Sequence, residues 1–311
     1  MVVIGKKISE MESLVISYSF FEPKSLHREM RTWDLWNNQD RYWYNIPVLM
    51  VVNSIVYPDA KIKIHLSKNI VENPLFEILD KISKKFCNIE LVKMSYDYTN
   101  TEPTMWRYKP VFDKESDVVL CRDIDSIPNT DEIKSTLFFL QNQNYFVHTL
   151  RTHTNHVIPH TIMLAGLCGF RPKQVYFLDN INFEMYYNHF QNSSWGLDQS
   201  SLINMFVRDQ NWTKERFLDS PISTQFHKVG SPLIPCNSIN QDVYRSQIEL
   251  GIDNQILDMI DSETKWAGEP TNFRGEKLRR FLEIDNPSIF KLKVVLEECS
   301  ENTKKFYLGD V

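Results

Sequence analysis

The stretch Asp117-Val-Val-Leu-Cys-Arg-Asp-Ile-Asp-Ser-Ile-Pro128 places an apolar run directly before a cluster of charged residues. Val118–Cys121 has the length and β-branched character of a buried central strand. Pro128 and the Asn129 that follows it are turn residues, and they end the segment. In open α/β sheets, ligands bind in the crevice outside the carboxyl ends of the strands. The sequence therefore predicts an α/β fold with a ligand site at the end of this strand.

Asp123 and Asp125 are two carboxylates separated by one residue, so on an extended segment their side chains point the same way. Two like charges this close repel unless something positive lies between them, and the usual partner is a divalent cation or an arginine. A hard cation held by one or two carboxylates plus substrate phosphates is a common arrangement. The simpler alternative is a solvated turn, and the apolar strand before the pair gives the metal site about equal weight.

The composition indicates a globular chain with one large domain, or one domain with a C-terminal extension. Of the 311 residues, 42% are hydrophobic, 13% aromatic and 24% charged, which provides ample material for a core. The net charge of -5 argues against a nucleic-acid-binding protein, which usually carries a basic face. No apolar run is long enough for a membrane span, and the N-terminus lacks the order of a secretory signal.

The cysteines indicate the redox compartment. Five of them are spread along the chain, an odd number without the spacing of a zinc site. They predict free thiols in a reducing compartment rather than a disulfide framework. We therefore expect a cytoplasmic protein that can still work at a membrane face.

Strands and helices are predicted to alternate before the acidic pair. Strands are expected at residues 14–21, 60–66 and 89–94, and helices with apolar residues at helical spacing are expected at residues 40–57 and 74–86. The order βαβαβ implies a mostly parallel sheet with helices on its faces. After the pair, a helix is predicted at residues 130–141, a strand at 145–149, and a strand or helix at 289–296.

Trp106-Arg107-Tyr108-Lys109-Pro110 is the candidate site segment before the central strand. Arg107 and Lys109 can reach phosphates or the acidic pair, and with Arg122 they are the candidate donor-binding cations. Trp106 and Tyr108 can stack on a base or a sugar. The alternative is that these aromatic residues belong to the core and that the cations are solvated.

Two later segments also carry candidate residues. In Gly196-Leu-Asp-Gln199, Asp198 either caps the helix that follows or, with Gln199, directs a carboxylate and an amide into a sugar site. His227 and Gly230 form a His-x-x-Gly arrangement, although a single late histidine is usually structural.

Together these segments resemble a known family. The chain is similar to nucleotide-sugar-dependent glycosyltransferases of the GT-A fold, especially small bacterial and viral ones with Trp-Arg-(Tyr/Phe)-x-Pro, Arg-Asp-x-Asp-Ser and Gly-x-Asp-Gln in this order. The likeness covers about residues 14–230 and continues only loosely, through Trp266-Ala-Gly-Glu-Pro270. It implies a GT-A (Rossmann-like) domain at residues 1–235, with a mostly parallel central sheet flanked by helices. Residues 236–311 would form a less regular C-terminal extension packed on it.

The resemblance also implies roles for individual residues. Asp123 and Asp125 would hold Mn²⁺ or Mg²⁺ on the diphosphate of a UDP- or GDP-sugar donor, where the metal neutralises charge on the leaving nucleotide. Asp198 and Gln199 would lie at the sugar, near the bond being exchanged, and His227 resembles the third metal ligand of retaining enzymes. The acceptor would be a glycan, or a hydroxyl of a lipid or protein.

The motifs indicate less clearly whether the reaction retains or inverts the configuration of the sugar. Retaining enzymes usually continue His-x-x-Gly with Lys-Pro-Trp, whereas this chain continues with Ser231-Pro-Leu-Ile. An inverting enzyme needs a carboxylate base on the acceptor, and Asp198 is the candidate for that role. The motifs favour retention slightly.

Two other functions remain open. The first is a metal-dependent nucleotidyltransferase or phosphoesterase that uses the same aspartates; it usually needs further carboxylates nearby, for which Asp113 and Asp117 are the upstream candidates. The second is a non-catalytic relative that binds a nucleotide or a sugar. Release of free nucleoside diphosphate from a sugar nucleotide would separate the glycosyltransferase from both.

Overall fold

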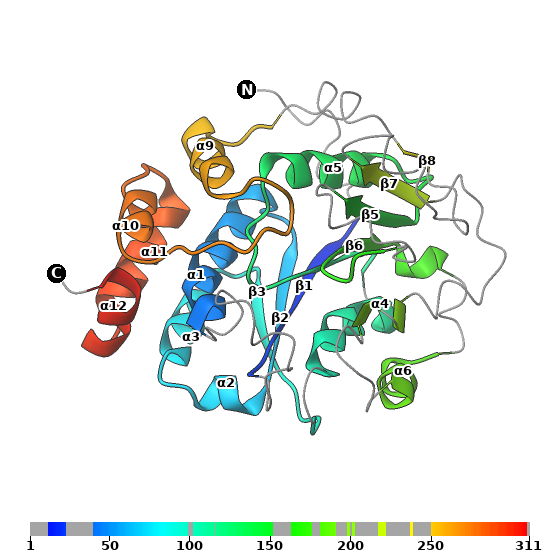
Figure 1. Ribbon diagram of the computed structural model, residues 1–311, viewed down its shortest axis with the longest axis horizontal. Helices are drawn as coiled ribbons and strands as arrows, with labels where there is room; N and C mark the ends of the chain where they lie inside the picture. The colour runs from blue at the N-terminus through cyan, green and yellow to red at the C-terminus, as the bar shows by residue number, and fades with distance from the viewer. Residues whose placement is uncertain are drawn as a thin grey trace, which may run out of the picture.

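The computed structural model describes residues 12–22, 40–98, 102–114, 116–151, 163–175, 181–190, 198–199, 201–202, 217–221, 237–238 and 250–309. Within these ranges the chain folds as an α/β structure in which helices cover a central sheet (Figure 1). The fold class predicted from the sequence is confirmed.

The described strands form one sheet in the order β3-β2-β1-β4-β6-β5-β7-β8. Their bounds are β1 Leu14–Phe20, β2 Lys61–Leu66, β3 Ile89–Lys93, β4 Val118–Arg122, β5 Val147–Arg151, β6 Leu167–Phe170, β7 Phe217–Pro221 and β8 Asn237–Ser238. β6 runs antiparallel to both of its neighbours, β4 and β5, and the other pairs are parallel. The sheet is therefore mostly parallel, as expected, and the four strands predicted up to residue 121 are all present.

β4 is central because its two faces contact two different cores. Val118 and Leu120 join the larger cluster of buried apolar side chains, whereas Val119 and Cys121 join the second. Side chains alternate between the faces of a strand, so a strand covered on both sides has a continuous apolar sequence. This burial explains the uninterrupted run Val118–Cys121.

β2 is buried on both faces although its sequence alternates between polar and apolar residues. Its sequence Lys-Ile-Lys-Ile-His-Leu alternates polar and apolar residues, yet every residue from Ile62 to Leu66 is buried. Nδ1 of His65 lies 3.0 Å from the main-chain oxygen of Tyr18. Burial lowers the pKa of His65 to about 4, so this ring is neutral at neutral pH and is accommodated inside the sheet layer.

The helices predicted at residues 40–57, 74–86 and 130–141 are present as α1 Asp40–Val56, α3 Phe76–Lys85 and α5 Thr130–Gln141. The structure also places helices that were not predicted, namely α2 Lys68–Glu72, η4 Glu102–Tyr108, α4 Lys109–Asp113, η6 Pro172–Gln174 and α6 Phe183–Phe190. Pro47 lies inside α1. The side chain of Asn129 caps α5 by accepting a hydrogen bond of 2.9 Å from the main-chain nitrogen of Glu132.

The C-terminal part is more regular than the sequence predicted. Four helices follow one another there, namely α9 Asn254–Glu263, α10 Glu276–Leu282, α11 Pro287–Glu298 and α12 Glu301–Leu308. α11 packs against α1 and α3, so Figure 1 shows α1 between the sheet and the C-terminal helices. Their apolar faces extend the larger core, which is why this segment is helical although its overall composition is polar.

Two further expectations can be compared with the described residues. Cys87, Cys121, Cys168 and Cys299 are free thiols, as predicted, and Cys236 lies outside the described ranges. No helix in those ranges has the length and apolar character needed to cross a membrane.

The packing of α11 predicts that the C-terminal helices unfold together with the sheet. Leu292 is fully buried in the larger core, so Leu292→Ala should lower the free energy of unfolding by about 2–5 kcal/mol. Phe290 on the same helix is 64% exposed, and Phe290→Ala should change it by less than about 0.5 kcal/mol. Urea denaturation measures both. Similar small losses for the two variants would mean that α11 is not part of the core.

Candidate functional site

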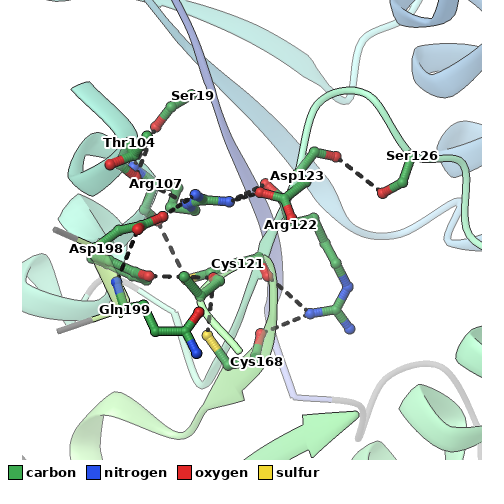
Figure 2. Close-up of polar contacts among 12 residues, drawn as sticks. Ser19, Thr104, Arg107, Cys121, Arg122, Asp123, Ser126, Cys168, Asp198 and Gln199 are labelled. Atoms are coloured by element: carbon green, nitrogen blue, oxygen red, sulfur yellow. Dashed lines mark hydrogen bonds and ion pairs between the residues drawn. The ribbon is translucent and has the colours of Figure 1, made fainter. Parts of the chain in front are cut away.

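Three segments that are distant in sequence meet beyond the carboxyl end of β4 (Figure 2). Arg107, in η4, binds Asp123 through Nη1 and Asp198 through Nη2, with 2.6 Å between Nη2 and Oδ2 of Asp198. Asp123 follows β4 directly, and Asp198 lies 91 residues from Arg107 in the sequence. Arg107 is therefore the group that connects the three segments of the predicted site.

The position of Arg107 is fixed by its other hydrogen bonds. Its main-chain nitrogen donates to Oγ of Ser19 at 2.9 Å, and its Nε donates to the main-chain oxygen of Thr104 at 2.9 Å. Nη1 also donates to the main-chain oxygen of Arg122 at 3.2 Å. Because the side chain is only 5% exposed, these contacts leave the guanidinium a single orientation.

The electrostatics of Arg107 keep it charged. Burial opposes the positive charge, but the carboxylates of Asp123 and Asp198 outweigh that effect and raise the pKa of Arg107 well above its ordinary value. The site therefore holds one permanent cation between two acidic groups.

Asp198 is the more buried of the two acids, with 13% of its side chain exposed. Burial raises the pKa of its carboxyl group, while the nearby charge of Arg107 lowers it and limits the rise. Its Oδ1 accepts a hydrogen bond of 2.9 Å from the main-chain nitrogen of Gln199. The carboxylate thus bonds locally to the main chain and also binds Arg107.

A hydrogen-bonded chain connects Asp198 to α6. Oγ of Ser201 donates to the main-chain oxygen of Asp198 at 2.8 Å, and the hydroxyl of Tyr186 contacts the same Oγ. Tyr186 is itself buried among the aromatic residues of the second core. Helix α6 therefore helps to set the position of Asp198.

Asp123 is the accessible acid, with 43% of its side chain exposed. It lies against Gly166, where an added Cβ would come within 1.8 Å of Oδ2 of Asp123. Any larger residue at position 166 would displace the carboxylate. Gly166 is therefore required by the position of Asp123.

Asp125 is more buried than Asp123 and lies in a turn rather than in the strand. β4 ends at Arg122, and Ile124 and Asp125 are turn residues, so the two-residue alternation of a strand does not continue through the pair. Asp125 is only 7% exposed, and its main-chain oxygen accepts hydrogen bonds from Asn45 and Thr271, both at 2.9 Å. The two aspartates thus have different surroundings.

The acidic pair fits a divalent cation only in part. Asp123 offers an exposed hard oxygen, and a cation such as Mg²⁺ is often held by one or two carboxylates together with substrate phosphates. Within the ranges that the structure describes, no three His, Cys, Asp or Glu side chains form a metal-binding group. His227, the third ligand implied by the resemblance, lies outside these ranges. Substrate phosphates would have to complete the coordination.

Arg122 contacts a different part of the fold. Its Nε binds Glu132 of α5, its Nη1 donates to the main-chain oxygens of Cys121 and Cys168 at 3.0 and 2.7 Å, and its Nη2 donates to Thr136 at 3.3 Å. The residue is 3% exposed. The expected donor-binding cation is thus engaged in the packing of β4 on α5.

The remaining candidates of the Trp106–Pro110 segment separate into core and surface. Trp106 and Tyr108 are 0% and 1% exposed, so they belong to the second core, which was the alternative to stacking on a ligand. Nζ of Lys109 pairs with Asp113 one turn later, with a shortest distance of 2.7 Å. Of this segment, only Arg107 is in contact with the two site acids.

Sequence reasoning missed several residues that support the site. Ser19 lies near the carboxyl end of β1, and the strand-end rule that identified Asp123 also applies to it. Asn45 is a polar residue among the apolar residues of the helix predicted at 40–57, which is an anomaly visible in the sequence. The contact of Tyr186 with Ser201 has no local signal, because it depends on how α6 packs.

Comparison with known proteins gives matches only at the level of solved structures. No protein-family model matches the chain, and no curated protein sequence matches it. Similar structures include S. aureus TarS residues 1–349 with UDP-GlcNAc, at 10% identity and a TM-score of 0.42, covering 95% of this chain and 73% of that one. The mannosyltransferase PcManGT from Pyrobaculum calidifontis with GDP-Man and Mn²⁺ matches at 10% identity and a TM-score of 0.40, covering 95% and 78%.

A third similar structure is glucosyl-3-phosphoglycerate synthase from Mycobacterium tuberculosis with Mn²⁺, UDP-glucose and phosphoglyceric acid. It is 12% identical, with a TM-score of 0.37, and the match covers 67% of this chain and 71% of that one. With TM-scores below 0.5, the function of this chain has to be inferred from its own residues.

The buried ion pair predicts a pH-dependent effect of Arg107→Met. This variant leaves Asp198 without its cation, so the free energy of unfolding should fall by about 3–5 kcal/mol near pH 7. A carboxyl group whose folded pKa lies above its unfolded value of 3.8 stabilises the fold below that value and loses the stabilisation as pH rises through the folded pKa. Removing Arg107 raises the folded pKa further, so the loss should shrink as the pH is lowered toward about 5.

Urea denaturation at the two pH values measures this effect. Lys173→Met is the control, because it breaks an exposed pair with Asp117 and should cost less than about 1 kcal/mol. An equal loss for Arg107→Met at both pH values would contradict the electrostatic coupling of Arg107 to Asp198.

Proposed function

We propose that the protein is a nucleotide-sugar-dependent glycosyltransferase that moves a sugar from a nucleoside-diphosphate donor to a hydroxyl of a glycan, lipid or protein. The observation that carries this proposal is the contact of Arg107 with both Asp123 and Asp198. Each of the three residues comes from a different one of the three motifs that resemble the family. A chance likeness of three short motifs gives no reason for them to meet at one point in the fold.

Asp123 and Arg107 are suited to bind the donor diphosphate. Arg107 is a fixed cation with donors in a planar fork, which matches phosphate oxygens. Asp123, with the help of Asp125, would hold Mn²⁺ or Mg²⁺ on the phosphates. When bound, this cation would neutralise the charge that builds on the leaving nucleoside diphosphate. Arg122 would support the same end of β4 from its other face.

Asp198 and Gln199 are proposed to lie at the transferred sugar. Both oxygens of Asp198 already accept a hydrogen bond, but a carboxylate has about four acceptor positions and can take another from a sugar or acceptor hydroxyl. This would orient the reacting hydroxyl in either stereochemical course. Retention is slightly favoured by the His-x-x-Gly arrangement of His227, and in an inverting enzyme Asp198 would be the base.

The competing phosphoryl-transfer function has less support. It would need further carboxylates close to the acidic pair. Asp113 pairs with Lys109, and Asp117 accepts hydrogen bonds from Ser13 and binds Lys173 at 2.8 Å. Both upstream carboxylates are therefore bound by residues other than Arg107.

Nucleotide binding tests the proposal first. Thermal stability should be measured with UDP, GDP, ADP and CMP, each with and without Mn²⁺. We expect one nucleoside diphosphate to stabilise the protein only when the metal is present, because its phosphates complete the coordination at Asp123. At 100 times the dissociation constant, the ligand should add about 2.7 kcal/mol to the free energy of unfolding.

The variant Asp123→Asn should lose this metal-dependent stabilisation while it keeps an oxygen for Arg107. Asp80→Asn is the matched control, because this exposed aspartate of α3 pairs with Lys84 on the helix surface. A metal-dependent shift that survives in Asp123→Asn would exclude Asp123 as a metal ligand.

Turnover of the donor separates the competing reactions. Glycosyl transfer or donor hydrolysis releases a nucleoside diphosphate, whereas a phosphoesterase that cleaves the diphosphate releases a nucleoside monophosphate and a sugar phosphate. With the nucleotide found by thermal stability, we expect diphosphate release from its sugar nucleotide. Asp198→Asn should slow this release roughly 100-fold, since it removes the charged group at the sugar, with a change in nucleotide dissociation constant of less than about threefold.

The same Asp80→Asn control should keep normal turnover. Monophosphate release by the unmodified protein would favour the phosphoesterase, and binding without any turnover would favour a non-catalytic relative.

A further inference from the structure

A buried amide occupies the face of α1 that is turned toward the end of the sheet. Asn45 is 0% exposed, and its neighbours in α1, among them Trp43, Tyr44 and Ile46, are also buried. A buried amide costs free energy unless its polar atoms are paired. Nothing in the proposed chemistry uses Asn45, so its place in an apolar helix needs another explanation.

The amide pairs with two segments that are far apart in sequence. Nδ2 of Asn45 donates to the main-chain oxygen of Asp125 at 2.9 Å and also to the main-chain oxygen of Thr271. Oδ1 accepts from the main-chain nitrogen of Phe273 at 3.2 Å. One side chain thus binds the turn that carries the acidic pair and the segment that precedes α10.

The same two segments also bind each other. The main-chain nitrogen of Thr271 donates to the oxygen of Asp125 at 2.9 Å, and Ser126 forms an antiparallel bridge with Pro270. The oxygen of Asp125 therefore has one donor from α1 and one from the C-terminal segment. Residues 266–273 are termed the strap below. They pair with the turn that follows the end of β4.

Packing holds the strap from its other side. Ala267 is fully buried against Leu150 and Leu167, and Leu167 begins β6 beside β4. Gly268 has a φ of +81°, and an added Cβ would lie 2.9 Å from Cδ1 of Leu167. In Figure 1 the orange segment between α9 and α10 loops from these helices toward the sheet. The Trp266–Pro270 motif of the sequence thus falls in a segment that is closely packed and lies beside the site.

We infer that Asn45 and the strap position the Asp123–Asp125 turn, so that Asn45 is a positioning residue of the donor site and the C-terminal helices are part of the catalytic unit. This inference rests on the proposed function. Ligands of a metal and a diphosphate have to be held within a fraction of an ångström, and supporting hydrogen bonds provide that precision. A turn without regular strand pairing needs such support from outside.

The test compares Asn45→Ala with Tyr307→Phe. Both remove buried hydrogen bonds between α1 and the C-terminal part, but the hydroxyl of Tyr307 donates to the main-chain oxygen of Trp43 at 3.0 Å and does not touch the turn. Calorimetry measures the dissociation constants of UDP and GDP in the presence of Mn²⁺. We expect Asn45→Ala to weaken the binding of the preferred nucleotide at least roughly tenfold, and Tyr307→Phe to change it less than about twofold.

Binding that is unchanged in Asn45→Ala, or weakened equally in both variants, would overturn the inference. Gly268→Ala provides a second route, because it displaces the strap and leaves Asn45 in place; it should also weaken binding. If Asn45→Ala does not fold, Gly268→Ala against Tyr307→Phe decides the result by the same criterion.

Hydrogen exchange separates this inference from the proposed function. The amides of Thr271 and Phe273 should be protected in the unmodified protein and lose protection in Asn45→Ala, but not in Tyr307→Phe. If the unmodified protein binds neither nucleotide, the proposed function fails, and the exchange result alone decides whether Asn45 and the strap hold the turn. Unchanged protection in Asn45→Ala would overturn the link itself.

Discussion

The site depends on one buried arginine that is shared by two carboxylates. Arg107 lies between Asp123 and Asp198 with 5% of its side chain exposed, and a charge with so little water needs partners. Each partner comes from a separate segment, so satisfying the charge also fixes the geometry. Ser19, Thr104 and the main-chain oxygen of Arg122 accept further hydrogen bonds from Arg107. The electrostatic requirement of one side chain thus brings the end of β1, η4, the end of β4 and the residues at 198–199 into contact.

A second buried ion pair acts on the opposite face of β4. Arg122 binds Glu132 of α5, and both side chains are 4% exposed. Consecutive residues at a strand end face opposite sides, so Arg122 turns toward α5 and Asp123 turns toward Arg107. Burial raises the pKa of Glu132, and the charge of Arg122 counteracts the rise. The end of β4 is therefore held from both sides, which gives a rigid base to the turn with the acidic pair.

The turn at Asp125 also connects α1 with the C-terminal segment of the chain. Its main-chain oxygen at Asp125 receives donors from α1 and from the strap, and α11 packs on α1 behind them. The C-terminal helices contribute apolar residues to the same core as β1 and β4. Packing and hydrogen bonding thus join the C-terminal segment to the sheet around one strand end.

The sequence by itself determined the elements whose signals are local. Apolar periodicity and turn residues identified β1 to β4, α1, α3 and α5, and the strand-end rule identified Asp123. It also restricted the neutralising partner of the acidic pair to a cation or an arginine, but it could not choose between them. Tertiary structure assigned Arg107 to Asp123, placed Trp106 in the core and ordered the C-terminal helices. These outcomes depend on which distant segments pack together and exclude water, and no pattern within a single segment encodes that choice.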